Sequence, residues 1–188
     1  METIRAFIAV ELPVAVKQEL GLAADVLAGL VPPRSVRWVK PDLIHVTLCF
    51  LGETAVAKLP AIQQTLDETA QKHAPLTLRL NGTGCFPNAR RPQVIWVGLA
   101  GDLAALAALK ADLDDGLASL GWEKEERPFQ PHLTLGRVNK GQKLAGFAAM
   151  AAVKEIAFPV TAVLLIESQL TRQGPVYTVR HVGKMRDT

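Results

Sequence analysis

Apolar and polar positions alternate along the chain in a way that predicts strands and helices in turn. The run 5–12 is apolar enough for a central strand. A helix is expected from Pro13, because proline suits a first helical turn and apolar residues then recur every three or four positions. The double proline at 32–33 ends it, since proline cannot continue a helix. Its apolar stripe is Val16, Leu20, Ala24 and Leu27.

Similar periodicities predict the remaining elements. Helices are expected over 60–73, over 103–117 with Gly121 as the stop, and, as a short one, over 142–149. Glycine at 52 and the Asn81-Gly82 pair should end the strands that precede them. The last two strands should form a hairpin across Gln173-Gly174-Pro175. The strands are expected over 44–51, 76–80, 92–99, 131–138, 160–167 and 176–182.

A strand-helix-strand unit occurs in each half of the chain, over 5–51 and 94–138. This weak duplication predicts an α+β fold of two similar lobes, with antiparallel sheets, helices on the outer faces and a pseudo-twofold axis. No low-complexity linker divides the chain, so residues 1–188 are interpreted as one bilobal domain. Symmetry would bring equivalent strands together at a central cleft.

One four-residue pattern occurs in both units. It reads His45-Val46-Thr47-Leu48 and then His132-Leu133-Thr134-Leu135, 87 positions later (132 − 45). Each copy lies in an apolar run that predicts a buried strand. Burying polar side chains in such a strand costs free energy unless they form hydrogen bonds, so they are kept where they have a function. The repetition of a costly arrangement therefore indicates function.

The pattern has a definite chemistry. Residues two apart on a strand share a face, so His45 projects with Thr47 and His132 with Thr134. Imidazole titrates near neutral pH, so one ring can act as a base while the other acts as an acid. Hydroxyls can donate hydrogen bonds to oxygens where charge develops. Together these groups suit in-line cleavage of a phosphodiester, and that chemistry needs no metal.

A second pair of equivalent positions follows the motifs. Arg137 lies five residues after His132, an odd offset that would aim it away from the site on an ideal strand. Gly136 precedes it, and a strand glycine often marks a bulge that re-aims a side chain. Phe50 has the same offset from His45. One position would offer a ring for a base to stack on and the other a cation for phosphate.

The histidines and cysteines also allow structural or metal-binding roles. A single buried histidine is most often structural, and His73 and His181 are interpreted so. Two histidines without Asp, Glu or Cys at ligand spacing make a poor metal site, so a metal is not expected. Cys49, which shares the parity of Thr47, is interpreted as a small apolar filler.

Composition narrows the class of protein. A net charge of +3 is too small to indicate nucleic-acid binding by itself, although it allows a local basic patch. Two cysteines without CxxC spacing suit a reducing cytoplasm. No run approaches the ~20 apolar residues of a membrane span. A cytoplasmic, monomeric protein that does not enter a membrane is expected.

The doubled motif resembles that of the two-histidine phosphoesterases. Within them the chain is most similar to the RNA 2',3'-cyclic phosphodiesterases, also called 2'-5' RNA ligases. The resemblance covers nearly the whole chain. It extends to the residues Arg5 to Pro13, Arg37-Trp38-Val39, Phe86-Pro87 with Arg90, and Leu165 to Leu170 with Tyr177.

This resemblance implies a role for each site residue. His45 would donate a proton to the leaving O3', and His132 would accept the proton of the attacking water. Thr47, Thr134 and Arg137 would contact the phosphate, and Phe50 would line the nucleotide site. The expected reaction is hydrolysis of a terminal 2',3'-cyclic phosphate of RNA, such as a tRNA fragment, to a 2'-phosphate. It would use no metal or cofactor and would be reversible as 2'-5' ligation.

Two alternatives stay open. The substrate could be a small nucleotide, such as a cyclic phosphate of ADP-ribose. The chain could also be a non-catalytic module that binds RNA ends. That module would use Trp38 and a set of nearby cations, Arg34, Arg37, Lys40, Arg90 and Arg91.

Overall fold

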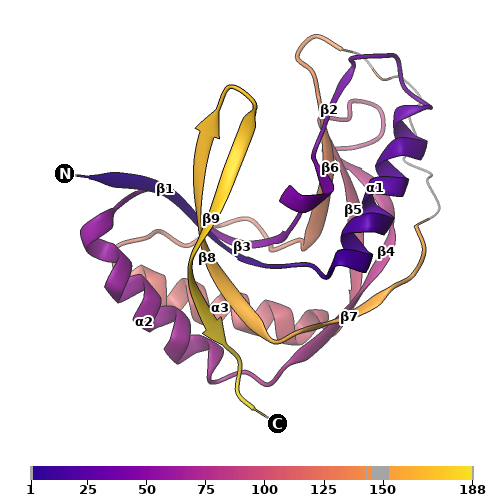
Figure 1. The fold of residues 1–188 in the computed structure, drawn as a ribbon. Coiled ribbons are helices and arrows are strands. Elements are labelled where there is room, and N and C mark those ends of the chain that lie inside the picture. The colour runs from indigo at the N-terminus through magenta and orange to yellow at the C-terminus, as the bar shows by residue number, and fades with distance from the viewer. Residues whose placement is uncertain (1, 143, 145–152, 188) are drawn as a thin grey trace.

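The computed structural model describes residues 2–142, 144 and 153–187. Its described residues form two antiparallel sheets flanked by helices (Figure 1). The helices are α1 (Val14–Ala28), α2 (Leu59–Ala70) and α3 (Leu103–Ser119), with short 3-10 turns at Pro41–Leu43 and Val56–Lys58. The strands are β1 (Thr3–Val10), β2 (Val36–Trp38), β3 (Val46–Ala55), β4 (Leu76–Phe86), β5 (Val94–Gly101), β6 (His132–Val138), β7 (Ala157–Val160), β8 (Ala162–Thr171) and β9 (Gly174–Lys184).

The two sheets confirm the predicted α+β architecture of two similar halves. One sheet has the strand order β3-β1-β8-β9 and the other the order β2-β6-β5-β4-β7. The motif strands β3 and β6 belong to different sheets and contact each other between them. The β8–β9 hairpin projects beyond the rest of its sheet (Figure 1). The fold thus brings the two copies of the motif to the junction of the sheets.

The helices connect the two sheets. Helix α1 follows β1 of the four-stranded sheet and contacts β6 of the other, whereas α3 follows β5 and contacts β3, β4 and α2. Helix α2 contacts β8 and β9. Most buried apolar residues form one continuous core cluster, which draws on both sheets and all three helices. A small second cluster lies on the other side of the four-stranded sheet and comprises Phe7, Ala9, Leu164, Ile166 and, half-buried, Tyr177.

Several predicted boundaries were wrong. Gly52 does not end its strand, because its left-handed φ of 65° fits a kink within β3, which runs on to Ala55. Gly82, with φ 62°, is likewise a bulge inside β4 and not a turn. The last hairpin turns at 172–173, one residue earlier than expected, and β9 already begins at Gly174.

Two short strands were not predicted. β2 and β7 have three and four residues, too few to show a clear alternation. Both are stabilised by pairing with a longer strand of the same sheet, β2 with β6 and β7 with β4. The helix expected over 142–149 falls almost entirely outside the described residues, and Gln142 itself is not helical.

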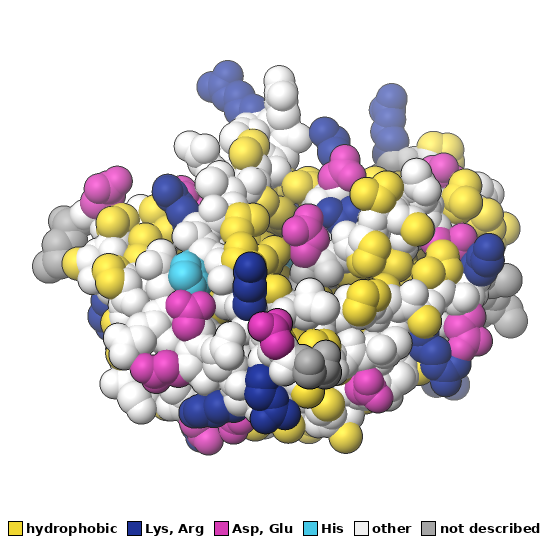
Figure 2. Space-filling model, turned by 60° about the horizontal axis from the view of Figure 1, so that its bottom comes forward, with side chains coloured by type: hydrophobic (Ala, Val, Ile, Leu, Met, Phe, Trp, Pro, Cys, Tyr) yellow, Lys and Arg dark blue, Asp and Glu magenta, His cyan; other side chains and the backbone are white. Residues whose placement is uncertain are grey.

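The side of the molecule on which α2 and α3 lie carries acidic and basic side chains interspersed with each other (Figure 2). Two ion pairs of α3 contribute to this mixture, His73 with Asp112 and Lys124 with Asp115. A mixed surface of this kind has no strong field of one sign. None of the described helices is long and apolar enough to cross a membrane.

Candidate active site between the two sheets

The internal duplication extends to the register of the strands. In the β1–β3 pair and the β5–β6 pair, residues 87 positions apart (132 − 45) hold the same places. Both pairs therefore present their side chains in the same order. In the β1–β3 pair the opposed residues are Val10 and Val46, Ala9 and Thr47, Ile8 and Cys49, and Phe7 and Phe50. The corresponding residues of the β5–β6 pair are, in the same order, Val97 and Leu133, Trp96 and Thr134, Ile95 and Gly136, and Val94 and Arg137.

Each motif strand carries a bulge at the fourth motif residue. In β3, the consecutive residues Ile8 and Ala9 of β1 oppose Cys49 and Thr47, so Leu48 between them is an extra residue. In β6, Leu135 is the extra residue for the same reason. A bulge reverses the alternation of the residues that follow it. The threonine and the residue three positions after it therefore share a face in both strands. The predicted bulge is confirmed in β6, although Leu135 and not Gly136 is the inserted residue.

The bulges gather the predicted site residues on one side of the sheets. Thr47 and Phe50 lie opposite Ala9 and Phe7, and Thr134 and Arg137 lie opposite Trp96 and Val94. Because directly opposed residues share a face, all four side chains project away from the core. We call the side that carries His45, Thr47, Phe50, His132, Thr134 and Arg137 the motif face.

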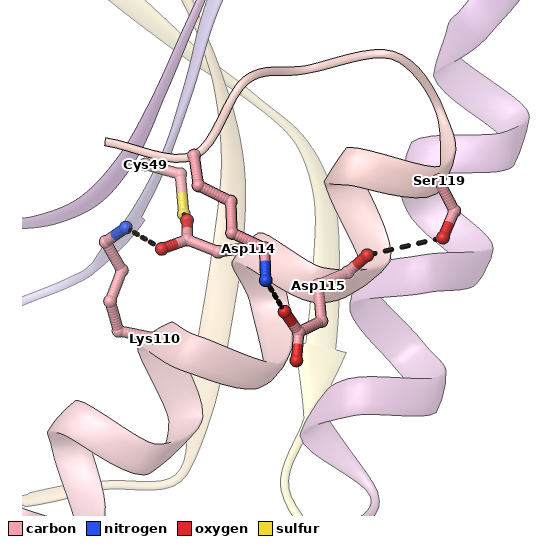
Figure 3. A network of polar contacts seen from close by, with 6 residues as sticks. Cys49, Lys110, Asp114, Asp115 and Ser119 are labelled. Carbon is pink, nitrogen blue, oxygen red and sulfur yellow. Dashed lines mark hydrogen bonds and ion pairs between the residues drawn. The ribbon is translucent and has the colours of Figure 1, made fainter. Parts of the chain in front are cut away.

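The same bulge contradicts the prediction for Cys49. Cys49 lies opposite Ile8, on the face turned away from Thr47, and its Sγ donates a hydrogen bond to Asp114 Oδ1 of α3 at 3.4 Å (Figure 3). Asp114 also pairs with Lys110 Nζ at 2.5 Å. Burial, together with the neighbouring Asp114 and against the opposing effect of Lys110, raises the pKa of Cys49 to about 12. The thiol is thus part of a buried polar network.

Each motif histidine is oriented by a carbonyl two residues before it. His45 lies immediately before β3 and not within it, and its Nδ1 is 2.9 Å from the oxygen of Leu43. His132 Nδ1 is 2.7 Å from the oxygen of Gln130. A carbonyl oxygen only accepts, so Nδ1–H is the donor in both rings. In the neutral ring the lone pair is then on Nε2, which leaves this nitrogen of each ring for proton transfer.

Aromatic side chains hold the two imidazoles. The ring of His45 stacks on Phe7, with centroids 4.6 Å apart at 26°, and Tyr177 of β9 meets it edge-on at 5.5 Å. His132 contacts the ring of Phe86 of β4 edge-on at 5.0 Å. Phe7 was not singled out from sequence as a site residue, and Phe86 and Tyr177 were noted only as part of the family resemblance. No local pattern links these aromatics to the motifs, because they belong to other strands, β1, β4 and β9.

The aromatic surroundings change the acidity of His45. The pKa of His45 is lowered to about 4, mainly because the ring is buried. The hydrogen bond to the Leu43 carbonyl raises the pKa, and the nearby cation Lys17 lowers it. His45 is therefore neutral at pH 7 in the free protein.

At the motif face, a charge of one sheet affects a titratable side chain of the other. Burial raises the pKa of Tyr177, and the Arg137 and Arg5 cations act in the opposite direction. Arg137 belongs to β6 and Tyr177 to β9, so a cation of one sheet acts on a hydroxyl of the other. Arg5 lies two residues before Phe7 on β1 and thus also on the motif face. Arg5 is a candidate site residue that the sequence had not indicated.

The remaining candidates differ in exposure. Thr47 and Thr134 are half-buried, while Arg137 is exposed. The side chain of Phe50 is 72% exposed, so its ring is available for stacking. His73 and His181 bind Asp112 and Asp67 through Nε2 at 2.7 and 2.8 Å, away from the motif histidines. Among the residues that the structure describes, no three His, Cys, Asp or Glu side chains are grouped to hold a metal.

Trp38 does not lie where the RNA-end module would need it. It opposes Gly136, on the core side of β6, and its ring packs against the core. Stacking on a nucleobase would require it on the motif face.

Comparison with known proteins gives a consistent result. A chain named RNA 2',3'-cyclic phosphodiesterase from Methanothermobacter thermautotrophicus is 30% identical over 186 residues, which cover 97% of this chain and 99% of the relative. One of the same name from Thermus thermophilus is 34% identical over 97% of this chain and 90% of its own length.

Solved structures agree. Apo E. coli LigT superposes with a TM-score of 0.79 at 28% identity over the full length of both chains. The protein TT0787 of Thermus thermophilus superposes with a TM-score of 0.79 at 32% identity, over 97% of this chain and 98% of that one. The family model of the 2'-5' RNA ligase superfamily matches residues 36–172. With both motif strands and their bulges inside the matched segment, this chain belongs to the 2'-5' RNA ligase superfamily.

Proposed function

We propose that this protein hydrolyses the terminal 2',3'-cyclic phosphate of RNA to a 2'-phosphate, with His45 and His132 as acid and base. The observation that carries the proposal is the doubled arrangement on the motif face. Two imidazoles have Nδ1 occupied by a carbonyl, and each is followed two residues later by a threonine on the same face. The names of the relatives point to the same activity.

The reaction needs two proton transfers. His132 Nε2 removes a proton from water as the water oxygen attacks phosphorus. The P–O3' bond breaks on the opposite side, and His45 delivers a proton to O3'. Because His45 is neutral in the free protein, it must first take up a proton. The negative charge of the bound phosphodiester favours this protonation.

The other candidates bind the substrate. The hydroxyls of Thr47 and Thr134 donate hydrogen bonds to the non-bridging oxygens, where negative charge grows in the transition state. Arg137 supplies a positive charge for phosphate, and the exposed ring of Phe50 stacks on the terminal base. No step in this scheme uses a metal or a cofactor.

The same groups could also join RNA ends. A 5'-hydroxyl would then take the place of water and form a 2'-5' bond, with acid and base exchanging roles according to the direction of the reaction. Action on RNA ends such as tRNA fragments, in the cytoplasm and as a monomer, stays a prediction.

An RNA oligonucleotide that ends in a 2',3'-cyclic phosphate provides the test. Incubated with excess chelator, wild-type protein should convert it to a 2'-phosphate. His45→Ala and His132→Ala should each lower kcat by about 10²–10⁴-fold, the usual value of one acid or base. His181→Ala is the matched control, because His181 pairs with Asp67 of α2 and should leave kcat unchanged.

Three outcomes would overturn the proposal. They are loss of wild-type activity in chelator, a 3'-phosphate product, and full activity of either motif variant. A protein that binds RNA ends without turnover, equally well when both histidines are replaced, would support the non-catalytic module instead. Faster turnover of a cyclic phosphate of ADP-ribose than of any oligonucleotide would favour the small-nucleotide alternative.

A further inference from the structure

The short strand β2 places a second arginine beside Arg137. In the β2–β6 pair, Arg37 lies directly opposite Arg137. Opposed residues share a face, so Arg37 also lies on the motif face. Both residues are exposed. Among the residues that the structure describes, neither forms an ion pair with a carboxylate.

This position of Arg37 is fixed by the residues on either side of it. Val36 and Trp38 turn to the core side and pack over Gly136, where a Cβ would come within 2.7 Å of Val36 Cγ1 and 2.9 Å of Trp38 Cε3. Beyond the strand, the N–H of Val39 donates to the oxygen of the bulge residue Leu135 at 2.8 Å. β2 is thus held firmly against β6, and Arg37 with it.

Two like charges directly across a sheet are unfavourable. Mixed charges cover the side of α2 and α3, but here two cations face each other at an edge strand. An anion between them would remove the repulsion, and guanidinium groups suit phosphate because they can bind it through two parallel hydrogen bonds.

Arg37 lies farther than Arg137 from the phosphate between the histidines, which Arg137 contacts. Arg137 is three residues beyond Thr134, roughly 7–10 Å along the strand at about 3.3 Å per residue. Arg37 is one strand further out, about 4.8 Å away. The arginine pair therefore suits a phosphate next to the reacting one, on the outer side of the motif face.

We propose that Arg37, together with Arg137, binds the phosphate on O5' of the terminal nucleoside. This inference rests on the proposed function and specifies its substrate. The O5' phosphate is present wherever the terminal nucleoside continues into an RNA chain. Arg37 thereby selects polynucleotide ends over free nucleoside cyclic phosphates.

Three substrates test this inference. They are a nucleoside 2',3'-cyclic phosphate with a free 5'-hydroxyl, the same compound with a 5'-phosphate, and an oligonucleotide with the same terminal nucleoside. Wild-type kcat/KM should be at least tenfold higher for the last two than for the first. Arg37→Ala should reduce this preference at least tenfold, mainly through KM. For the oligonucleotide, the slope of log kcat/KM against log salt concentration should be smaller in magnitude for Arg37→Ala than for wild type, by about 0.7.

The matched control is Arg186→Ala, which removes the same charge next to His73, near the C-terminus. It should retain the wild-type preference and salt dependence. The inference is overturned if Arg37→Ala lowers kcat/KM equally for all three substrates, for none of them, or for the oligonucleotide but not for the 5'-phosphorylated mononucleotide. Inactivity of the wild type on all three would instead remove the proposed function itself.

Discussion

His45 shows how neighbouring side chains control one titrating group. Phe7 and Tyr177 exclude water from its ring, and the resulting pKa is about 4, below the value of 6.5 in an unfolded chain. Between pH 6.5 and 4 the unfolded chain therefore binds a proton at this residue that the folded chain does not. The contribution of His45 to stability is complete above pH 6.5 and is lost as the pH falls toward 4.

Replacing His45 with glutamine should remove this part of the pH dependence. Between pH 7 and pH 4, the free energy of unfolding of the wild type should fall by about 3 kcal/mol more than that of His45→Gln. Urea denaturation at several pH values measures the difference. Parallel curves for the two proteins would show that His45 is protonated equally in the folded and unfolded states.

At the scale of elements, the bulges and the close approach of β2 to β6 shape the motif face. The bulges turn Phe50 and Arg137 toward the threonines of their own strands. Gly136 lets Trp38 and Val36 lie against β6, which brings Arg37 beside Arg137. The absence of a side chain at one position thus determines which cations meet.

Gly136→Ala should displace β2. The added methyl would clash with Val36 and Trp38, and overpacking of this kind costs about 1–3 kcal/mol of folding free energy. Chemical denaturation provides the measurement. Gly29→Ala is the control, because its φ of −68° is ordinary and its nearest neighbour would be 3.4 Å from the new Cβ. Equal free energies of unfolding for Gly136→Ala and wild type would mean that β2 moves aside without loss of stability.

At the scale of the whole molecule, elements from one sheet hold strands of the other. Helix α3 follows β5, yet its Asp114 binds Cys49 of β3 (Figure 3). The loop after α3 adds a hydrogen bond from Trp122 Nε1 to the oxygen of Leu51 at 3.0 Å. The main hydrophobic cluster is shared by both sheets. Neither lobe retains a complete core without the other.

We expect the two lobes to unfold together, as a single domain. Tryptophan fluorescence, which reports on Trp38, Trp96 and Trp122, and far-UV circular dichroism should give coincident transitions. Asp114→Ala leaves Lys110 buried without its partner, and should lower stability by about 3 kcal/mol as measured by either probe. Two separate midpoints would indicate lobes that fold independently.

Much of the fold and the candidate residues of the two motifs follow from the sequence alone. Apolar periodicity located the three main helices and the long strands, because burial of one face is a local property of the pattern. The repeated His-x-Thr motif indicated the duplication, and the constant offset of 87 positions (132 − 45) recurs in the paired registers. The candidates His45, Thr47, His132 and Thr134 could be named for the same reason.

Only the tertiary structure decided which other side chains surround these four residues. The parity of Cys49, the aromatic rings on the histidines and the pairing of Arg37 with Arg137 all depend on which strands pair and in which register. A bulge of one residue reverses every later side chain, and no local pattern marks Leu48 or Leu135 as the inserted residue. Partners that are distant in the chain meet through packing of the whole core, and this packing assembles the motif face.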